Sequence, residues 1–549
     1  MTKAQLIQNQ PNIIWIVCED ISPYMGSYGD PIIRTPNIDE LSSQSVRFTR
    51  VYTTAGVCAP SRSSIITGMH QIAIGTQHMR TRSVDPKFKP DGLPDYWAVL
   101  PEEVKAFPEF LRKVGYYTSN NHKEDYQFEE PVTVWDASSP ASTYRNRAED
   151  QPFFSVFNFA RTHESQMMRQ QDSIGYDPKK MQVPMYFEDT EITRKDLALL
   201  YTRIEEMDSQ VGELIAQLKE DGVYEDSYIF FFSDHGGMMP WTKRAVLERG
   251  THIPLIIKYP KGQHAGTINN DLISAVDFAP SVVSIAGIKP PEYMHGKAFL
   301  GVYSSKIQNK YVFASSDRFD EKYDRIRSVS DGSFRYIYNF HPDKSKYMDL
   351  GYRKGIRTMK EILERKENND ISNPYLLDWF AHNKPVEELY YTLKDTDEVY
   401  NLADDPQYQS KKEELKSVLF EWLNQVGDLS NQPEIEMIKN WWNGKDTPPV
   451  TAEAEITFKN GQATLSCKTP GASIGYRIQK TAILDSIIHP IQSWDFYAVM
   501  GKSNAPKKMK VPKPWKVYAG HPISLNKGEV LIVNTHRIGY ESSIKYLKY

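Results

Sequence analysis

Cysteines and long apolar runs are both scarce in this sequence, and each scarcity removes a class of protein. The 549 residues include only three cysteines, Cys18, Cys58 and Cys467. An odd and sparse set of thiols does not favour a framework of disulfide bonds. No run approaches the roughly 18 apolar residues of a membrane-spanning helix, and segment 1–10 has no apolar core of a signal peptide. We predict no membrane span, and we expect either a cytoplasmic chain or the mature form of an exported one.

The sequence also lacks an excess of positive charge. Its formal net charge is −4, so no global field would draw a nucleic acid to it, and we predict no nucleic-acid partner. An anionic ligand would have to be held by a local cluster of Lys, Arg and His side chains. Hydrophobic residues make up 40% and charged residues 25% of the chain, as in ordinary globular proteins. The length allows about two to four domains.

Strands and helices alternate along the first part of the chain. Continuous apolar runs, typical of buried parallel strands, predict strands over 12–17, 116–120, 153–159, 228–233 and 253–258. Helical patterns between them cover 35–43, 198–219 and 277–286. This alternation predicts a doubly wound α/β domain with a large mixed sheet over residues 1–330.

The character of the sequence changes after residue 330. Alternating residues over 334–338 and a helical pattern over 411–426 predict a smaller subdomain, residues 331–446, with an antiparallel sheet and a helix. Thr447-Pro448-Pro449 reads as a linker. The short strand-like runs beyond it predict an accessory β-sandwich module over residues 447–549.

Two predicted strands end in pairs of possible metal ligands. Glu19-Asp20 follows the first strand, and Asp234-His235 follows the strand that ends at Ser233. The carboxyl ends of parallel strands form the edge where ligands bind in open α/β sheets. Oxygen-rich ligand sets select Ca²⁺ or Mg²⁺. Cys58 lies in a loop among small residues, just before a helix that we expect over 63–67.

The segment Cys58-Ala59-Pro60-Ser61-Arg62, followed by Thr67-Gly68, resembles the modification signature of the formylglycine-dependent sulfatases in the alkaline phosphatase superfamily. Further landmarks arrive in family order: Ser233 to Gly236, Lys243 five residues before Glu248, and Glu388 to Tyr390. The resemblance covers roughly residues 10 to 410. It implies that a formylglycine-generating enzyme oxidises Cys58 to formylglycine.

The resemblance also implies roles for individual residues. The hydrate of formylglycine would be the nucleophile, held by Arg62, with Lys123 and Lys243 gripping the sulfate and His163 protonating the leaving oxygen. The metal would be Ca²⁺, with Mg²⁺ as the alternative. Its implied ligands are Glu19, Asp20, Asp234, His235 and the modified Cys58. Relatives more often have Asp at the position of Glu19 and often Asn at that of His235.

One segment departs from the family pattern. Many relatives read Gly-Lys-Trp-His where this chain has His122-Lys123-Glu124-Asp125. The family's histidine removes a proton late in turnover, and here either His122 or Asp125 would have to do so. We favour His122, because imidazole has the more suitable pKa.

The substrate is less sharply indicated. The opening Glu19 to Pro23 resembles the sulfamidase-like branch of bacterial carbohydrate sulfatases, and His78 and Arg80, expected to be exposed, could line a subsite for an anionic sugar. We therefore predict hydrolysis of sulfate esters on a sulfated glycan, in the periplasm or outside the cell by resemblance. The alternatives are an N-sulfoglucosamine sulfohydrolase, a phosphoester or phosphonate monoester hydrolase, and a carbohydrate-binding protein whose cysteine is never converted.

Overall fold

A large sheet organises the computed structural model, which describes residues 10–82, 85–169, 174–490 and 508–549. Strand β7 is antiparallel to both of its neighbours, whereas all other adjacent pairs are parallel. The order of the eight strands is β4 (Ala137–Ser138), β3 (Tyr117–Asn121), β5 (Phe153–Phe159), β1 (Asn12–Cys18), β6 (Ser227–Ser233), β7 (Leu255–Lys258), β2 (Val46–Tyr52) and β8 (Thr267–Ser274).

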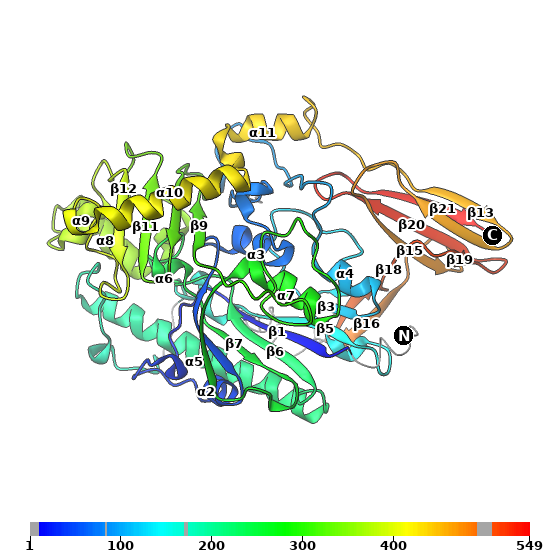
Figure 1. Cartoon of the computed structure of the whole chain (residues 1–549), viewed down its shortest axis with the longest axis horizontal. Helices are drawn as coiled ribbons and strands as arrows, with labels where there is room; N and C mark the ends of the chain where they lie inside the picture. Colours follow the sequence, from blue (N-terminus) through cyan, green and yellow to red (C-terminus); the bar gives the residue numbers. More distant parts are fainter. Residues whose placement is uncertain (1–9, 83–84, 170–173, 491–507) are drawn as a thin grey trace.

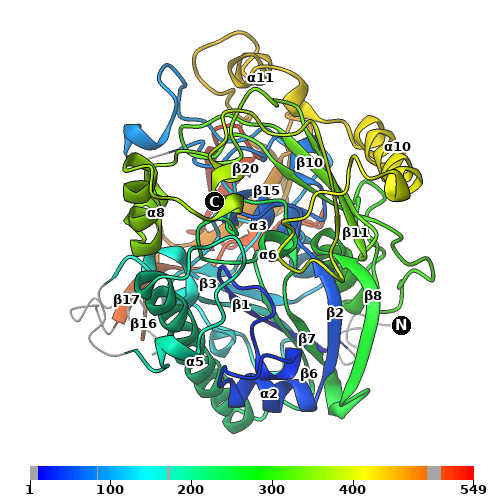
Figure 2. The same cartoon turned by 90° about the vertical axis from the view of Figure 1, so that its left-hand side faces the viewer.

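Both faces of this sheet are covered by helices, as the continuous apolar strands require. Along β1, Ile14 and Ile16 enter one core while Ile13 and Trp15 enter the other. Helices α2 (Pro36–Ser43) and α5 (Glu191–Glu220) pack in the first core. Helices α3 (Cys58–Thr67), α4 (Pro108–Lys113) and α7 (Phe278–Ile285) pack in the second. Figure 2 shows α2 and α5 together on the side of the sheet opposite α3. The predicted doubly wound mixed sheet is confirmed.

Helix α5 begins earlier than the predicted helix over 198–219. Its first turn contains a single apolar residue, the exposed Ile192, so apolar periodicity does not reveal it. The Thr190 side chain caps this turn by accepting a hydrogen bond from the backbone N–H of Thr193.

A smaller antiparallel sheet lies beside the large one. Its order is β12 (Glu387–Tyr391), β11 (Phe334–Asn339), β10 (Ile326–Ser330) and β9 (Val312–Ser316). Helix α10 (Gln409–Val426) packs on it through a shared apolar cluster. Strands β9 and β10 precede the predicted boundary at residue 331, so a boundary before β9 would keep this sheet whole. The remaining helices are α6 (Glu248–Thr251), α8 (Arg357–Glu367), α9 (Pro374–Trp379) and α11 (Glu434–Trp441).

The C-terminal part forms a β-sandwich, as predicted. One sheet contains β13 (Glu455–Lys459), β14 (Gln462–Ser466) and β19 (Ile523–Ser524). The other contains β18 (Lys516–Val517), β15 (Ser473–Gln479), β20 (Val530–His536) and β21 (Ser543–Lys548). Strands β16 (Ser486–Pro490) and β17 (Lys508–Pro512) form a separate pair. One apolar cluster joins the sheets of the sandwich.

The sandwich projects from one end of the molecule, beside α4 (Figure 1). It docks on the large domain through close contacts. Ser473 donates a 2.6 Å hydrogen bond to the buried Glu109 of α4. At Gly539 a Cβ atom would lie 2.5 Å from Cα of Val99, so only glycine allows this approach.

Among the described residues, no helix combines the length and apolar character that crossing a membrane requires.

Candidate active site

Three neighbouring strands bring predicted site residues to one edge of the large sheet. Cys18, the last residue of β1, pairs with Phe159 of β5 on one side and Ser233 of β6 on the other. The residues that follow these strand ends therefore meet. The backbone N–H of Asp20 donates to Oδ1 of Asp234 at 3.2 Å, which ties the two loops together.

Cys58 faces this edge from the first position of α3. We expected it in a loop before a helix over 63–67, but the helix begins at Cys58 itself, and Pro60 lies in its first turn, where proline's missing N–H costs no hydrogen bond. Every residue of α3 is buried. The Cys58 Sγ lies 3.2 Å from Nε2 of His235 and 3.8 Å from Nζ of Lys243.

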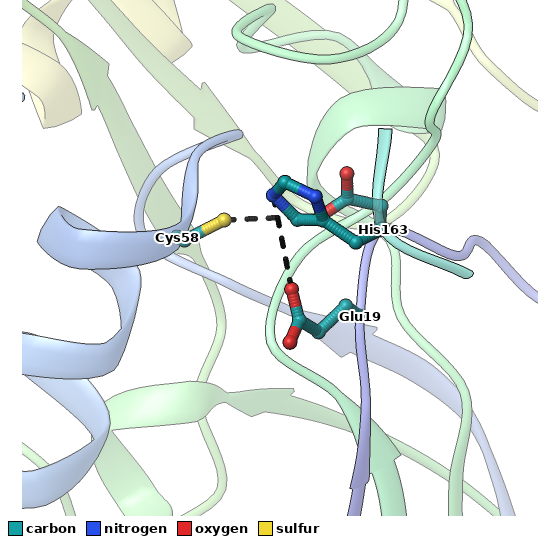
Figure 3. Close-up of side chains that lie close together, drawn as sticks. Glu19, Cys58 and His163 are labelled. Atoms are coloured by element: carbon teal, nitrogen blue, oxygen red, sulfur yellow. Dashed lines mark hydrogen bonds and ion pairs between the residues drawn. The ribbon is translucent and has the colours of Figure 1, made fainter. Parts of the chain in front are cut away.

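Glu19, Cys58 and His163 point toward one another from three different segments of the chain (Figure 3). One ligand atom from each of them, and one from Asp20, all lie within 4.8 Å of one another. His163 follows the short 3-10 helix η5 (Ala160–Thr162) at the end of β5. Its Nδ1 accepts a hydrogen bond from the backbone N–H of Ser165 at 3.2 Å. The proton of the neutral ring therefore lies on Nε2, which is 3.9 Å from Oε2 of Glu19.

The possible ligands form one cluster, made up of Glu19, Asp20, Cys58, His163, Asp234 and His235. Each buried carboxylate of this cluster already has a cationic partner. The pairs are Lys123–Glu19 (2.6 Å), Lys243–Asp20 and Arg62–Asp234 (2.9 Å). Without cations these carboxylates would repel one another, but Lys123, Lys243 and Arg62 balance their charge. Charge balance alone therefore does not demand a metal.

Two buried atoms of the cluster nevertheless lack a partner. Oε1 of Glu19 accepts no hydrogen bond, and Nη2 of Arg62 donates none. Unsatisfied buried polar atoms are costly in a protein interior. Oε1 of Glu19 is an acceptor that a cation could satisfy, and Nη2 of Arg62 is a donor that an oxyanion could satisfy. The site therefore fits a bound cation together with a bound oxyanion.

The oxygen-rich side of the cluster suits a hard cation. A second group of possible ligands joins His235 to Asp20, Cys58 and Asp234, again within 4.8 Å. Burial lowers the pKa of His235, but Asp234, Cys58 and Asp20 raise it well above its usual value. A protonated imidazole cannot bind a metal, so an ion in this position would displace that proton.

The two lysines make the Cys58 position electropositive. Burial raises the pKa of the thiol, but Lys123 and Lys243 outweigh it and lower that pKa to about 7. The same surroundings would stabilise any anionic oxygen held at this position.

The two residues predicted to line a sugar subsite differ in exposure. His78 was expected to be exposed, which is wrong: it is 5% exposed, and its Nδ1 accepts from the backbone N–H of Arg318 at 3.3 Å. Arg80 is partly exposed and pairs with Asp320 at 2.5 Å. The sequence gives no sign of the turn that buries His78.

Of the two candidate late bases, Asp125 contacts the cluster. Its Oδ2 lies 3.5 Å from Nζ of Lys123. Burial raises the pKa of Asp125, but Lys123 and Arg62 lower it below its usual value. The pKa of the partly buried His122 is lowered by burial.

Sequence reasoning missed two buried residues of the site. The backbone N–H of Glu164 donates to Oδ2 of Asp20 at 2.8 Å, and Arg244 binds both oxygens of Glu164 at 3.0 and 2.9 Å. The only signal was position in the chain, since they directly follow the predicted residues His163 and Lys243.

Comparisons with known proteins found matches over most of the chain. The sulfatase family model matches residues 11–138 and 134–288. A model described as N-sulphoglucosamine sulphohydrolase, C-terminal, matches residues 236–375. An ulvan-active sulfatase of Formosa agariphila is 40% identical over 573 residues, covering 98% of this chain and 91% of the relative. Human N-sulphoglucosamine sulphohydrolase is 24% identical, with 76% of this chain and 90% of the relative covered.

Solved structures share the fold. A protein in complex with its substrate D-glucosamine-2-N,6-O-disulfate aligns with a TM-score of 0.53 and 17% identity, over 77% of this chain and 99% of its own. The phosphonate monoester hydrolase of Agrobacterium radiobacter aligns with a TM-score of 0.56 and 15% identity, over 76% and 96%. At such identities the likeness establishes the fold and not the reaction.

Proposed function

The chain belongs to the sulfatase family, and on that basis we propose that it hydrolyses sulfate esters on a sulfated carbohydrate derived from a polysaccharide. The observation that carries this proposal is the 40% identity, over 98% of the chain, to a relative named as an ulvan-active sulfatase. The periplasm or the cell exterior as the place of action is part of the same proposal.

The proposal includes conversion of Cys58 to formylglycine by a formylglycine-generating enzyme. The hydrate of formylglycine would supply one hydroxyl to attack sulfur and a second to release sulfate. The position fits such a group, because Cys58 is buried beside Lys243 and His235 at the start of α3. The N-terminus of that helix favours negative charge.

The cations of the cluster would hold the sulfate. Arg62 keeps an unpaired Nη2, and Lys123 and Lys243 keep donors beyond those used on Glu19 and Asp20. Donors fixed in a buried site stabilise the charge that builds on the sulfuryl oxygens, without reorganising during the reaction.

His163 would protonate the leaving oxygen. Its tautomer is set by Ser165, which leaves the Nε2 proton facing the cluster. A sugar alkoxide is a poor leaving group, so this proton matters more for sugars than for phenols.

The late proton acceptor is proposed to be His122, with Asp125 as the competing residue. The contact between Asp125 and Lys123 favours Asp125, whereas the usual imidazole pKa favours His122. The variant that lacks the true acceptor should release one equivalent of nitrophenol in a burst from nitrophenyl sulfate and then stall.

A divalent cation, Ca²⁺ or alternatively Mg²⁺, would lie among Glu19, Asp20, Asp234, His235 and residue 58. It would supply Lewis-acid polarisation of a sulfuryl oxygen. The partnerless Oε1 of Glu19 supports this site on grounds independent of charge balance. The protein's part is to converge these oxygens and to release the proton of His235.

Two other activities compete with sulfate-ester hydrolysis. The match of residues 236–375 favours N-sulfoglucosamine cleavage, and the shared fold admits phosphonate or phosphoester hydrolysis. Release of sulfate from defined oligosaccharides, including ulvan fragments and N-sulfoglucosamine, should be compared with release of phosphate from nitrophenyl phosphate. Ester sulfate should be released fastest. Phosphate release faster than every sulfate release would refute the proposal.

A further inference from the structure

A second cationic cavity adjoins the proposed active site. It lies between the segment Trp241–Leu247 and the small sheet, and its lining includes Trp379 and Tyr390. Its cationic lining residues are Lys243, Arg244, Lys346, Arg353 and Lys384. Lys243 joins this cavity to the catalytic cluster, because its Nζ also lies 3.8 Å from Cys58 Sγ.

Four of these five cations are paired with carboxylates. The pairs are Lys243–Asp20, Arg244–Glu164 (2.9 Å), Lys346–Glu388 (2.9 Å) and Lys384–Asp324. Arg353 is the exception. It is 5% exposed, and its side chain makes no hydrogen bond or ion pair with any part of the chain that the structure describes. The aromatic rings of Tyr347 and Trp379 lie 6.0 and 5.9 Å from its guanidinium carbon.

A nearly buried guanidinium without a carboxylate partner is costly, because burial removes much of its water without supplying acceptors. Burial and the neighbouring Arg244 lower the pKa of Arg353 to about 10, so the side chain stays charged at neutral pH. Two further buried donors of this cavity, Nε of Arg244 and Nε1 of Trp241, also lack acceptors. The lining carboxylates Glu388 and Glu398 pair with Lys346 and Arg335, so the positive charge of Arg353 has no carboxylate partner among the described residues.

The segment that carries Arg353 also contacts Arg80. It is the 3-10 helix η10 (Tyr352–Gly355). The ring of Tyr352 lies 4.8 Å below the guanidinium carbon of Arg80, one of the residues that we expected to contact sugar. Tyr352 therefore links the neighbourhood of Arg353 to Arg80.

We propose that Arg353, with Arg244 beside it, binds a second anionic group of the substrate, a carboxylate or a second sulfate on the glycan whose scissile sulfate lies at Cys58. This inference rests on the proposed sulfatase function. A guanidinium matches both groups, because its planar donors fit paired oxygens. The site would therefore select glycans with at least two anionic groups.

The test uses matched substrates with the full-length protein. One pair is a monosulfated disaccharide that contains a hexuronate and its carboxyl-reduced form. The other is a disulfated disaccharide and its monosulfated counterpart. Wild type should prefer the more anionic member of one pair, and that pair identifies the group that is bound. Arg353→Met should lower kcat/KM on that member about 30-fold or more, mainly through KM, and should change the other members little.

Lys354→Ala is the matched control. It removes the adjacent positive charge of η10, but that side chain is 42% exposed and pairs with Asp349. It should leave all four rates near wild type, whereas Arg353→Lys should keep part of the preference. The melting temperature of Arg353→Met should not fall, because the variant loses a buried charge that has no protein partner.

The outcomes distinguish failure of the second anion site from failure of the proposed sulfatase function. Equal losses on all four substrates, or no preference in wild type, would overturn the second anion site. A melting temperature reduced by more than about 4 °C would point instead to a structural role for Arg353. No sulfate release from any of the substrates by wild type would count against the proposed function itself.

Discussion

Arginines of the small sheet and arginines of the catalytic edge are similarly buried, but they differ in how completely their donors are paired. Arg318, Arg327 and Arg335 are each at most 1% exposed. Arg327 binds Asp317 and Asp428, and none of the buried nitrogens of these three arginines lacks a partner. Arg62, Arg244 and Arg353 are also buried, yet each keeps a nitrogen without an acceptor.

The difference distinguishes arginines that hold the fold together from arginines that could bind a ligand. A fully paired buried arginine has no capacity left for a ligand, and it holds together the segments that supply its carboxylates. A buried arginine with open donors costs free energy until something else binds. In this comparison, incomplete pairing distinguishes the arginines beside the proposed substrate site from those of the small sheet, whereas burial does not.

The strongest test removes the nucleophile position. Cys58→Ala should abolish turnover of every sulfate ester, by about 10⁴-fold or more, because no other side chain can supply the hydrate. The melting temperature should stay within a few degrees of the parent, since one small buried atom is lost. Sulfate release and thermal unfolding measure the two effects. Residual activity within tenfold of the parent would end the formylglycine mechanism.

Chelation tests whether a metal ion that the reaction needs binds at the unpaired Oε1 of Glu19. Exhaustive treatment with a chelator should inactivate the enzyme by about 100-fold or more, and Ca²⁺ or Mg²⁺ should restore it. The paired cations balance the cluster, so the metal-free protein should remain folded by circular dichroism. Full activity in protein shown to be free of metal would show that the site assignment is wrong.

His163→Ala should have a smaller effect that depends on the leaving group. Sulfate release from a sugar should fall by about 10²-fold or more, whereas release from nitrophenyl sulfate should change little, because a phenolate leaves without a proton. Steady-state rates on both substrates measure the split. Equal losses would remove His163 from the role of general acid.

The role of the fully paired arginines is tested at Arg327. Arg327→Met leaves Asp317 buried without its arginine, while Asp428 keeps Arg325, and should lower the free energy of unfolding by about 3–5 kcal/mol. The folded fraction should keep its kcat. Arg34→Ala is the control, because its pair with Glu205 is exposed and worth at most about 1 kcal/mol. Denaturant titration compares the two variants. Similar losses would show that the buried, fully paired arginine stabilises the fold no more than the exposed one does.

The smallest effect concerns Glu398, which pairs with Arg335 together with Glu248. Burial raises the pKa of Glu398 to about 8, with the Glu248 carboxylate adding to the rise and Arg335 opposing it. A folded-state pKa above the unfolded value means that stability falls as pH rises from about 4.5 to 8, by at most about 1.4 kcal/mol per unit. The pKa of Glu248 is lowered, so its contribution lies below that window.

Glu398→Gln should flatten this fall, because the amide cannot ionise. Unfolding measured at several pH values between 5 and 8 checks the slope. An unchanged slope would mean that Glu398 is already ionised in the folded protein.

Much of the fold follows from local pattern. Strand β5 occupies the predicted residues 153–159, since seven consecutive buried positions need a continuous apolar run. The family and the sulfatase assignment are confirmed by the 40% identical relative. The boundaries of polar helical turns could not be predicted, because hydrophobic periodicity does not mark them.

The candidate site was predicted only where a motif or a strand end marked it. Glu164 and Arg353 carry no such mark. The ion pair between Arg318 and Glu434 joins residues 116 positions apart, and His78 is buried beside it. Pairing over such separations depends on tertiary folding, so burial of His78 and the open donors of Arg353 emerge only in three dimensions.

The glycine contacts of the β-module have a hydrodynamic and calorimetric consequence. A Cβ at Gly471 would lie 2.3 Å from the carbonyl oxygen of Glu102, much as Gly539 meets Val99. A side chain at either position would collide with the backbone of the large domain, so the docking of the module depends on glycine at both. We therefore expect the docked module to tumble with the large domain, with a single rotational correlation time, and to melt together with it under one heat-capacity peak.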